Sequence, residues 1–401
     1  MSTESDYVPS GGVTSPGGFM AGATSAGIKY PIGQRYDLGI LLSTKSCVTA
    51  GAFTTNKVKA APVLLCKERL KRGGIRAIVM NSGCANACTG QQGMADAQEM
   101  TELAAKNIGI KKEEVLVAST GVIGTMLPME RIRAALPKVM FSPGGGHDLA
   151  RAIMTTDRVP KEVAVKTDDF TIGGILKGSG MLHPDMATLL CFLTTDAPVE
   201  PNFLRQALKE SAAISFNMLT VDGDSSTNDS LIIIANGVTG GETIRVGSHK
   251  ARAFQQALDK VCIYLAKEAA RDGEGATKLI EVRVSGAVTL HEAQIAARTI
   301  AGSSLVKTAV YGADPNWGRI LAAAGRSGAN MEEGKAELHL GETSVVKDGT
   351  PVKFDKESVV NYLKGNEINI RLNLHLGRGE ATAWGCDMTE EYVKINAEYT
   401  T

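Results

Sequence analysis

Short apolar runs that suit β-strands alternate along this chain with longer segments of helical periodicity, and this alternation constrains the fold more than any other feature. The strand-like runs are residues 75–80, 115–118 and 231–235. Apolar residues recur at helical spacing in residues 94–107, 201–215 and 251–270. Strands that alternate with helices are typical of α/β proteins. The sequence therefore predicts an α/β fold.

Two segments predict how their elements are buried. Residues 201–215 begin with a proline, whose missing N–H costs nothing at the start of a helix, so a helix is expected there. Residues 367–377 alternate apolar and polar side chains, which is the pattern of a strand with one buried and one solvated face. Residues 142–146 and 221–229 carry turn chemistry and are expected to be loops or site loops.

Composition excludes several function classes. Lys plus Arg and Asp plus Glu both number 43, so no net charge draws the chain to nucleic acid or to an anionic membrane. The 7 cysteines are scattered in a chain too large to need disulfides, which favours a reducing cytoplasm. Cys84 and Cys88 have no matching Cys or His pair, so no metal site is expected. The first residues do not resemble a signal or transit peptide, and no apolar run is long enough to span a membrane.

The segment that carries chemistry is KGSGMLHPDMATLLCFLTTD, residues 177–196, in which a glycine-rich turn and a proline precede an apolar run that contains Thr188. If the Thr188 hydroxyl attacked the carbonyl carbon of Ala187, the peptide bond would become an ester. Hydrolysis of that ester would leave Thr188 with a free α-amine. Such an amine titrates near neutral pH and can act as general base for its own hydroxyl.

The spacing of the residues in this segment is equally consistent with a purely structural interpretation. Residues 177–180 would then be a surface turn, and residues 187–193 a buried strand that merely begins near Thr188.

Resemblance to a known family favours the chemical interpretation. The run KGSGMLHPDMATLLCFLTTDA resembles the signature of the ornithine acetyltransferase family, also called glutamate N-acetyltransferase, whose members cleave themselves between the alanine and threonine of that motif. Further segments resemble family segments in the same order: NSGCANACTG at 81–90, STGVIG at 119–124, MTTD at 154–157, TVDGDSSTND at 220–229, EGATKLIEV at 274–282, YGADPNWGRI at 311–320 and the terminal NAEYTT. The resemblance therefore spans nearly the whole chain.

The resemblance implies three catalytic residues. Thr188 matches the family's nucleophile, which holds the acetyl group as an ester between two half-reactions. Thr120 and Gly121 match the oxyanion hole, whose donors face the charge that develops on the acyl oxygen.

The resemblance also implies a set of substrate-binding residues, which are Thr155, Lys177, Thr188, Glu274, Asn396 and Thr401. An ammonium group such as that of Lys177 suits the α-carboxylate that N-acetylornithine and glutamate share, and Glu274 suits a substrate amine. Thr155 is favoured over Thr156, although the sequence does not separate the two neighbours. Two positions depart from the family pattern, which usually has asparagine at Cys84 and at Asp185. Asp185 places a carboxylate three residues before the nucleophile and is expected to tune the cleavage rate or the pKa of the new amine.

The family implies acetyl transfer from N2-acetylornithine to glutamate by a ping-pong route, as part of arginine biosynthesis, with no cofactor or metal. Some members also use acetyl-coenzyme A, and the sequence leaves open whether this chain does. The implied fold is a layered sandwich of helices outside paired β-sheets, similar to self-processing aminopeptidases. Residues 1–187 and 188–401 would form an alpha and a beta chain that share one core and one active site, assembled as two of each in the cytoplasm, without nucleic-acid or membrane partners.

Two alternatives remain at this stage. The first is a self-processing aminopeptidase or amidohydrolase of the same fold, in which water accepts the acyl group. The second is a binding protein that keeps the fold without chemistry, against which the presence of Thr188, Thr120 and Gly121 argues.

Overall fold

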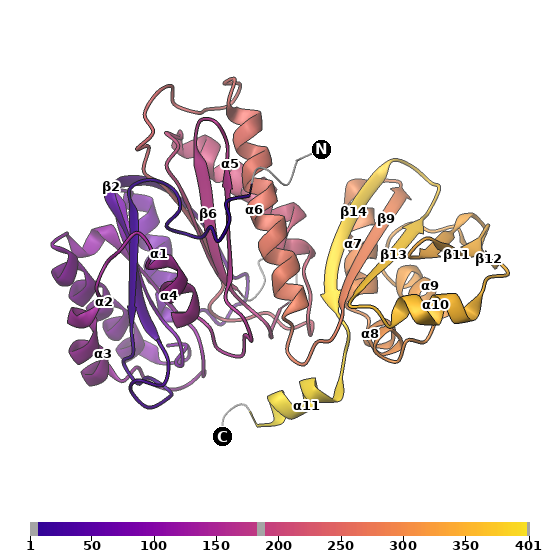
Figure 1. Cartoon of the computed structure of the whole chain (residues 1–401), viewed down its shortest axis with the longest axis horizontal. Helices are drawn as coiled ribbons and strands as arrows, with labels where there is room; N and C mark the ends of the chain where they lie inside the picture. The colour runs from indigo at the N-terminus through magenta and orange to yellow at the C-terminus, as the bar shows by residue number, and fades with distance from the viewer. Residues whose placement is uncertain (1–6, 183–188, 399–401) are drawn as a thin grey trace. The chain divides into compact units, whose positions relative to one another are not determined.

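Helices and β-sheets alternate throughout the computed structural model, which describes residues 7–182 and 189–398 (Figure 1). The chain divides into two compact units. The first contains Met1–Gly178, Asp185–Ala212 and Ser225–Leu265, and the second contains Ser179–Pro184, Ala213–Asp224 and Ala266–Thr401. Each unit has a sheet of its own. The predicted α/β class with two sheets is thus confirmed.

The first unit contains an eight-stranded sheet in the order β4-β3-β2-β8-β7-β6-β5, with β1 paired to β2. Its strands are β1 (Phe19–Thr24), β2 (Leu38–Phe53), β3 (Ile75–Asn81), β4 (Val115–Ser119), β5 (Lys161–Lys166), β6 (Thr171–Lys177), β7 (Leu190–Thr195) and β8 (Ser230–Ala235). The long strand β2 pairs with β3 through its first part and with β8 through its second part. The strands expected at 75–80, 115–118 and 231–235 are confirmed as β3, β4 and β8.

The helices of this part of the chain are α1 (Ala61–Arg72), α2 (Gly90–Ile108), α3 (Met129–Ala135), α4 (Gly146–Ala152), α5 (Pro201–Ile214) and α6 (Ala251–Arg271). The three predicted helices correspond to α2, α5 and α6. At the start of α5 the Glu200 carboxylate accepts hydrogen bonds from the backbone N–H groups of Asn202 at 3.0 Å and Phe203 at 2.9 Å. These bonds satisfy N–H groups that have no partner within the helix.

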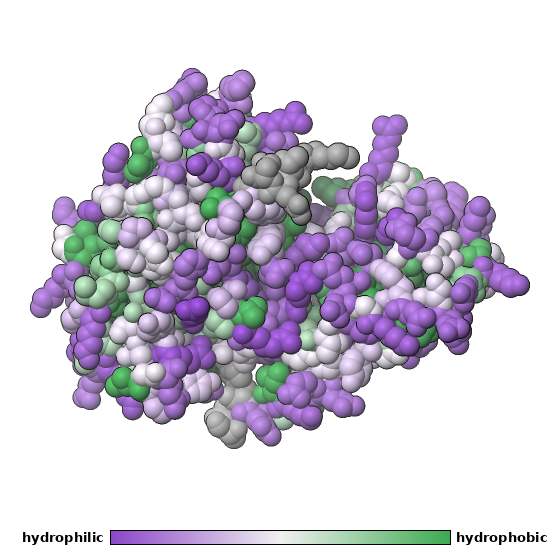
Figure 2. Space-filling view, in the orientation of Figure 1, coloured by the Kyte–Doolittle hydropathy of each residue, from purple (hydrophilic) through white to green (hydrophobic). Residues whose placement is uncertain are grey.

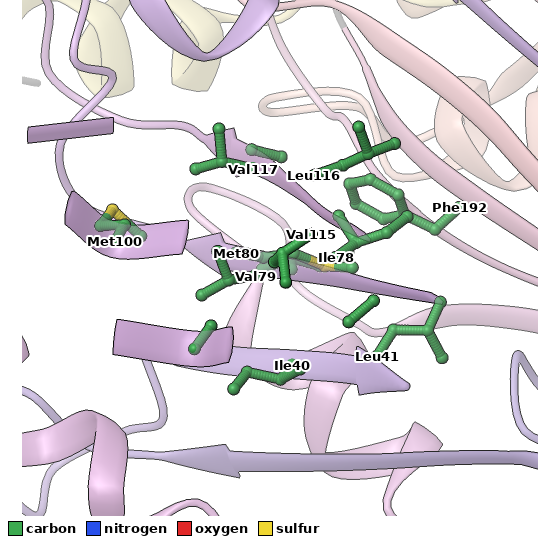
Figure 3. Close-up of a cluster of buried hydrophobic side chains, with 14 of the residues drawn as sticks. Ile40, Leu41, Ile78, Val79, Met80, Met100, Val115, Leu116, Val117 and Phe192 are labelled. Carbon is green, nitrogen blue, oxygen red and sulfur yellow. The ribbon is translucent and has the colours of Figure 1, made fainter. Parts of the chain in front are cut away.

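A hydrophobic core fills the space around β2, β3 and β4 in the first unit (Figure 3). Ile40, Ile78, Val117 and Phe192, from four different strands, belong to it and are at most 1% exposed. Burying each side chain of this size stabilises the fold by about 1.5–3 kcal/mol. Phe192 brings β7 into the same core as the strands that precede it in the chain.

The second unit contains a six-stranded sheet in the order β12-β11-β10-β13-β9-β14. Its strands are β9 (Leu279–Ala287), β10 (Glu337–Leu340), β11 (Thr343–Lys347), β12 (Thr350–Pro351), β13 (Glu367–Asn373) and β14 (Gly379–Cys386). Its helices include α7 (Leu290–Ala301), α8 (Ser304–Tyr311), α9 (Trp317–Gly325), α10 (Lys356–Leu363) and α11 (Glu390–Ala397). The predicted alternation is confirmed in β13, where Ile368, Ile370 and Leu372 are at most 1% exposed and their neighbours are not buried.

The side of the molecule seen in Figure 2 is mainly hydrophilic, with hydrophobic side chains in small separate patches. Scattered apolar residues of this kind are usual on protein surfaces.

Candidate active site

The turn that follows β4 holds the two predicted oxyanion-hole residues. The backbone N–H of Thr120 donates to the carbonyl oxygen of Asn81 at 3.0 Å. Gly121 has φ +128°, and a Cβ there would lie 2.3 Å from the carbonyl carbon of Gly83. Only glycine fits this conformation and this close approach of two backbone segments. The turn is therefore held tightly against the loop that follows β3.

Asparagine side chains connect this turn to two other predicted motifs. Asn81 accepts a hydrogen bond from the Ser119 hydroxyl at 2.6 Å and donates to the Cys84 carbonyl at 2.9 Å. Asn228, from the loop expected at 221–229, donates to the carbonyl oxygens of Ala85 at 2.6 Å and Ser119 at 2.8 Å. Three segments that lie far apart in the sequence thus meet at the turn that carries Thr120 and Gly121.

Asp157 connects the predicted binding residue Thr155 with the end of β6. Its carboxylate accepts the backbone N–H of Thr155 at 3.0 Å, the Lys161 ammonium at 2.6 Å and the backbone N–H of Gly178 at 2.9 Å. Burial by itself would raise the pKa of Asp157, but the ammonium groups of Lys161 and Lys177 and these hydrogen bonds lower it to about 2. The carboxylate is therefore charged at neutral pH.

Lys177 is the last residue of β6 and is 6% exposed. Its ammonium group faces the carboxyl groups of Asp157 and Asp229. Within residues 7–182 and 189–398 this ammonium makes no hydrogen bond. Residues 177–180 are all buried, so the alternative that they form a surface turn is wrong.

The beginning of β7 lies between Lys177 and the loop before β8. Leu190 pairs with Lys177 on one side and with Ser230 on the other. Leu189, which follows the predicted nucleophile, accepts a hydrogen bond from the Ser230 N–H through its carbonyl oxygen at 2.9 Å. Thr188, Ala187 and Asp185 lie outside the described residues. All six residues of β7 are buried, which confirms the expected strand.

Asp229 immediately precedes β8 and is 2% exposed. No described residue forms a hydrogen bond with either of its carboxyl oxygens. Burial raises the pKa of Asp229 well above its usual range, against opposing effects of the Lys177 ammonium, the Thr54 and Ser226 hydroxyls and the Leu189 N–H.

The second unit brings Glu274 and Asn396 together. The Asn396 side-chain amide donates to Glu274 Oε2 at 2.8 Å, and the Glu274 N–H donates to the Ser179 carbonyl at 2.7 Å. A Cβ on Gly180 would lie 2.3 Å from the Glu274 carboxyl carbon. The Glu274 carboxylate therefore occupies space that only glycine at position 180 leaves open. Thr401 lies outside the described residues.

Asp222 holds the segment that leads toward the predicted cleavage site. Its carboxylate accepts the backbone N–H groups of Met181 at 2.5 Å and Leu182 at 2.9 Å. Met181 has φ +53°, a left-handed conformation that is uncommon for a residue other than glycine. Burial and the neighbouring Glu274 raise the pKa of Asp222, although the N–H groups that it binds lower it in part.

Asp157, Asp222, Asn228 and Asp229 were not predicted as individual site residues. Each belongs to a motif that the sequence shows, MTTD or TVDGDSSTND, whose polar residues also suit ordinary turns. Hydrogen bonds to distant segments distinguish Asp157, Asp222 and Asn228, and burial distinguishes Asp229.

Cys84 and Cys88 do not form a metal site with other described residues. Cys84 is 2% exposed, its thiol donates to the Thr125 carbonyl at 3.1 Å, and burial raises its pKa. Among residues 7–182 and 189–398 no three His, Cys, Asp or Glu side chains lie close enough to hold a metal ion.

Comparison with known proteins identifies the family. A model of the ArgJ family matches residues 20–401. The chain belongs to the ArgJ family. Two of its relatives are named "Arginine biosynthesis bifunctional protein ArgJ". The relative from Dehalococcoides mccartyi is 52% identical over 100% of both chains. The relative from Symbiobacterium thermophilum is 53% identical over 98% of this chain and 99% of that one. The predicted ornithine acetyltransferase family is thereby confirmed.

An ArgJ crystal structure from Bacillus halodurans aligns with a TM-score of 0.50 and 45% identity, over 51% of this chain and 97% of that chain. Membership in the ArgJ family supports an enzyme that acts on small molecules, as the sequence predicts. No described helix is long and apolar enough to cross a membrane.

Proposed function

We propose that this ArgJ-family chain is a self-cleaving acetyltransferase of arginine biosynthesis, which transfers the acetyl group of N2-acetylornithine to glutamate through an acetyl ester of Thr188. The transfer yields ornithine and N-acetylglutamate. The observation that carries the proposal is the placement of Leu189 and Leu190, which follow Thr188, between the buried ammonium of Lys177 and the buried carboxyl of Asp229. Burying ionisable groups on both sides of a strand end costs folding free energy, and buried groups of this kind are typical of functional sites.

The first step in the proposal is maturation. The Thr188 hydroxyl attacks the Ala187 carbonyl carbon, the C–N bond breaks as the C–O bond forms, and water then hydrolyses the ester. The products are a carboxylate on Ala187 and an amine on Thr188. The half-length ArgJ chain from B. halodurans, 97% of which aligns with only 51% of this chain, supports a two-chain mature form.

The second step is acetyl transfer. The Thr188 hydroxyl attacks the acetyl carbonyl carbon of N-acetylornithine while the Thr188 amine takes its proton, and that proton then passes to the leaving amine of ornithine. Thr120 and Gly121 stabilise the oxyanion, a role supported by the close backbone contacts that hold their turn. The glutamate amine attacks the ester in the second half-reaction and restores the free hydroxyl.

Substrate binding is assigned to residues of the two product chains, which we propose share one active site. Lys177 binds the α-carboxylate, and its ammonium, which is buried and makes no hydrogen bond to a described residue, supports this role. Glu274, oriented by Asn396, binds a substrate amine. Thr155 and Thr401 complete the proposed set.

The proposed reaction needs neither a metal nor a bound cofactor, because the nucleophile, the base and the oxyanion donors all belong to the protein. Acetyl-coenzyme A is an additional donor to be tested. We expect a cytoplasmic assembly of two alpha and two beta chains, without nucleic-acid or membrane partners.

Mass spectrometry of the purified protein tests the proposal. Wild-type protein should appear as chains 1–187 and 188–401, and N-acetylornithine without glutamate should add one acetyl group to the second chain. Glutamate should then remove it. Thr188→Ala should stay a single inactive chain. An active protein that remains full length, or an acetyl group that water releases as fast as glutamate does, would contradict the proposal.

A further inference from the structure

Asn228 is a buried side chain to which the proposed reaction gives no role. It lies in the loop that leads into β8 and is 6% exposed. Its side-chain amide donates to two backbone carbonyl oxygens, that of Ala85 at 2.6 Å and that of Ser119 at 2.8 Å. Its side-chain oxygen accepts from the Thr227 hydroxyl at 2.6 Å. The nitrogen and the oxygen of this amide are therefore both engaged, which fixes its orientation.

The peptide group between Ser119 and Thr120 is held at both of its polar atoms. Its carbonyl oxygen, which belongs to Ser119, accepts the bond from Asn228. Its N–H, which belongs to Thr120, donates to the Asn81 carbonyl oxygen at 3.0 Å. A peptide group is planar, so hydrogen bonds to both its C=O and its N–H prevent it from rotating. The direction of the bond from this peptide group to the Thr120 Cα atom is thereby fixed.

The loop that carries Asn228 is itself anchored within the first unit. The Thr54 hydroxyl donates to the Ser226 carbonyl at 2.7 Å, and the Ala60 N–H donates to the Thr227 carbonyl at 3.0 Å. In the sheet order β4-β3-β2-β8, two strands separate β8 from β4. The Asn228 amide therefore connects the turn after β4 to a fixed loop that does not belong to a neighbouring strand.

We propose that Asn228 is a positioning residue of the oxyanion hole, whose side-chain amide fixes the 119–120 peptide group and so aims the Thr120 hydroxyl at the acyl oxygen. Thr120 is only partly buried, and its hydroxyl makes no hydrogen bond to residues 7–182 or 189–398. Oxyanion donors act because they are preorganised, and a displacement of about 1 Å can slow a reaction about 10²-fold. The inference rests on the oxyanion role proposed for Thr120 and Gly121.

Steady-state kinetics of the mature enzyme test this role. Asn228→Ala should lower kcat for acetyl transfer at least about tenfold and leave KM for both substrates within about twofold of wild type, because an oxyanion donor acts mainly on the transition state. The value of kcat is expressed per chain that N-acetylornithine can acetylate, as counted by mass spectrometry, so that inactive or uncleaved protein does not contribute to the loss.

A double-mutant cycle asks whether Asn228 acts through Thr120. Independent losses multiply, whereas residues that act as one unit give a smaller combined loss. In the Thr120→Val background, Asn228→Ala should therefore lower kcat by no more than about threefold. A side chain that only supports the fold would lower kcat by the same factor in both backgrounds.

Asn236 provides a matched control in the same unit. It is also 6% exposed, and its side-chain amide donates to the Gly17 carbonyl at 2.9 Å. Asn236→Ala therefore removes an equally buried amide with a backbone acceptor and should leave kcat and KM unchanged. If Asn228→Ala does not fold or mature, Asn228→Ser, which keeps one hydrogen-bond donor, replaces it with the same expected non-additivity.

Wild-type kcat in Asn228→Ala, a loss expressed in KM, or equal losses of kcat in the two Thr120 backgrounds would each overturn the inference. Thr120→Val with wild-type kcat would instead refute the oxyanion role on which the inference depends. A failure of the positioning role and a failure of the proposed oxyanion hole are therefore distinguishable.

Discussion

Gly121 shows how the structure decides which residue gives a clean test of the oxyanion hole. Replacing it with proline would remove the backbone N–H, but φ +128° is incompatible with proline and a Cβ would lie 2.3 Å from the Gly83 carbonyl carbon. A loss of activity in such a variant could come from a distorted backbone and would not test the loss of a hydrogen-bond donor. Thr120 is better suited, because its backbone N–H is occupied by the Asn81 carbonyl and only its hydroxyl needs to change.

We therefore predict that Thr120→Val lowers kcat about 10²–10³-fold with little change in KM, because an oxyanion donor acts mainly on the transition state. Steady-state kinetics with N-acetylornithine and glutamate provide the measurement, and Thr120→Ser, which keeps the hydroxyl, is the matched control. A raised KM at unchanged kcat would place Thr120 in substrate binding instead.

Asp157 should contribute to stability in a pH-dependent way. The pKa of Asp157 is about 2 in the folded protein against 3.8 for an ordinary aspartate. The carboxylate therefore contributes fully to the free energy of unfolding above about pH 4, and this contribution is lost as the pH falls toward 2. The difference corresponds to about 2 kcal/mol. Urea unfolding of wild-type protein and Asp157→Asn between pH 2 and 7 should show two curves that approach each other in acid.

At neutral pH Asp157→Asn should lower the free energy of unfolding by about 3–5 kcal/mol, since it removes one member of a buried ion pair. Glu68→Gln is the control, because Glu68 pairs with Arg72 on the surface with both side chains 60% exposed, and it should cost less than about 1 kcal/mol. Equal losses in the two variants would argue against a special role for Asp157.

At the scale of elements, α11 contributes contacts without contributing to the core. None of its residues is buried, yet Asn396 binds Glu274, and Thr389, just before the helix, donates to the Gly275 carbonyl at 2.7 Å. A helix attached in this way positions polar groups and adds little apolar burial. Its loss should therefore affect substrate use before it affects stability.

Removal of residues 398–401 is accordingly predicted to leave self-cleavage and the unfolding midpoint unchanged but to lower kcat/KM for both substrates at least tenfold, about 1.4 kcal/mol. Chain ends usually tolerate truncation, so the opposite result is the ordinary expectation. A cleaved truncation variant with wild-type kcat/KM would show that the tail is passive.

At the scale of the whole molecule, the proposed cut falls between neighbouring strands of one sheet. β6 precedes Thr188 and β7 follows it, and six residue pairs join the two strands in register. Phe192 of β7 lies in the same core as Ile78 of β3 (Figure 3). Hydrogen bonds and apolar burial should therefore hold the two product chains together after the peptide bond is cut.

We predict that the mature protein elutes as one species in gel filtration and separates into two chains only under denaturing conditions. Phe192→Ala, which opens a cavity and should cost about 3–5 kcal/mol, should lower the urea concentration at which the chains separate. Spontaneous separation in native buffer would contradict the shared sheet.

Periodicity along the chain was sufficient to predict the elements. The alternation of Ile368, Ile370 and Leu372 identified β13, and the proline at 201 with helical spacing after it identified α5, because both patterns depend only on neighbouring residues. Resemblance to family motifs supplied the residue roles, which local patterns alone did not distinguish from turns. Glu274 and Asn396 are examples, since neither stands out from its neighbours in the sequence.

What only the tertiary structure decided is the order of the strands and the surroundings of the acids. Sequence alone determined an α/β fold and a polar loop at 221–229, and it predicted a cleavage site before Thr188. The position of β7 between β6 and β8 places Leu190, the first residue of β7, between Lys177 and Ser230, which follows Asp229. Strand order depends on packing between segments that are distant in the chain, and burial, which raises the pKa of Asp229, exists only once that packing is complete.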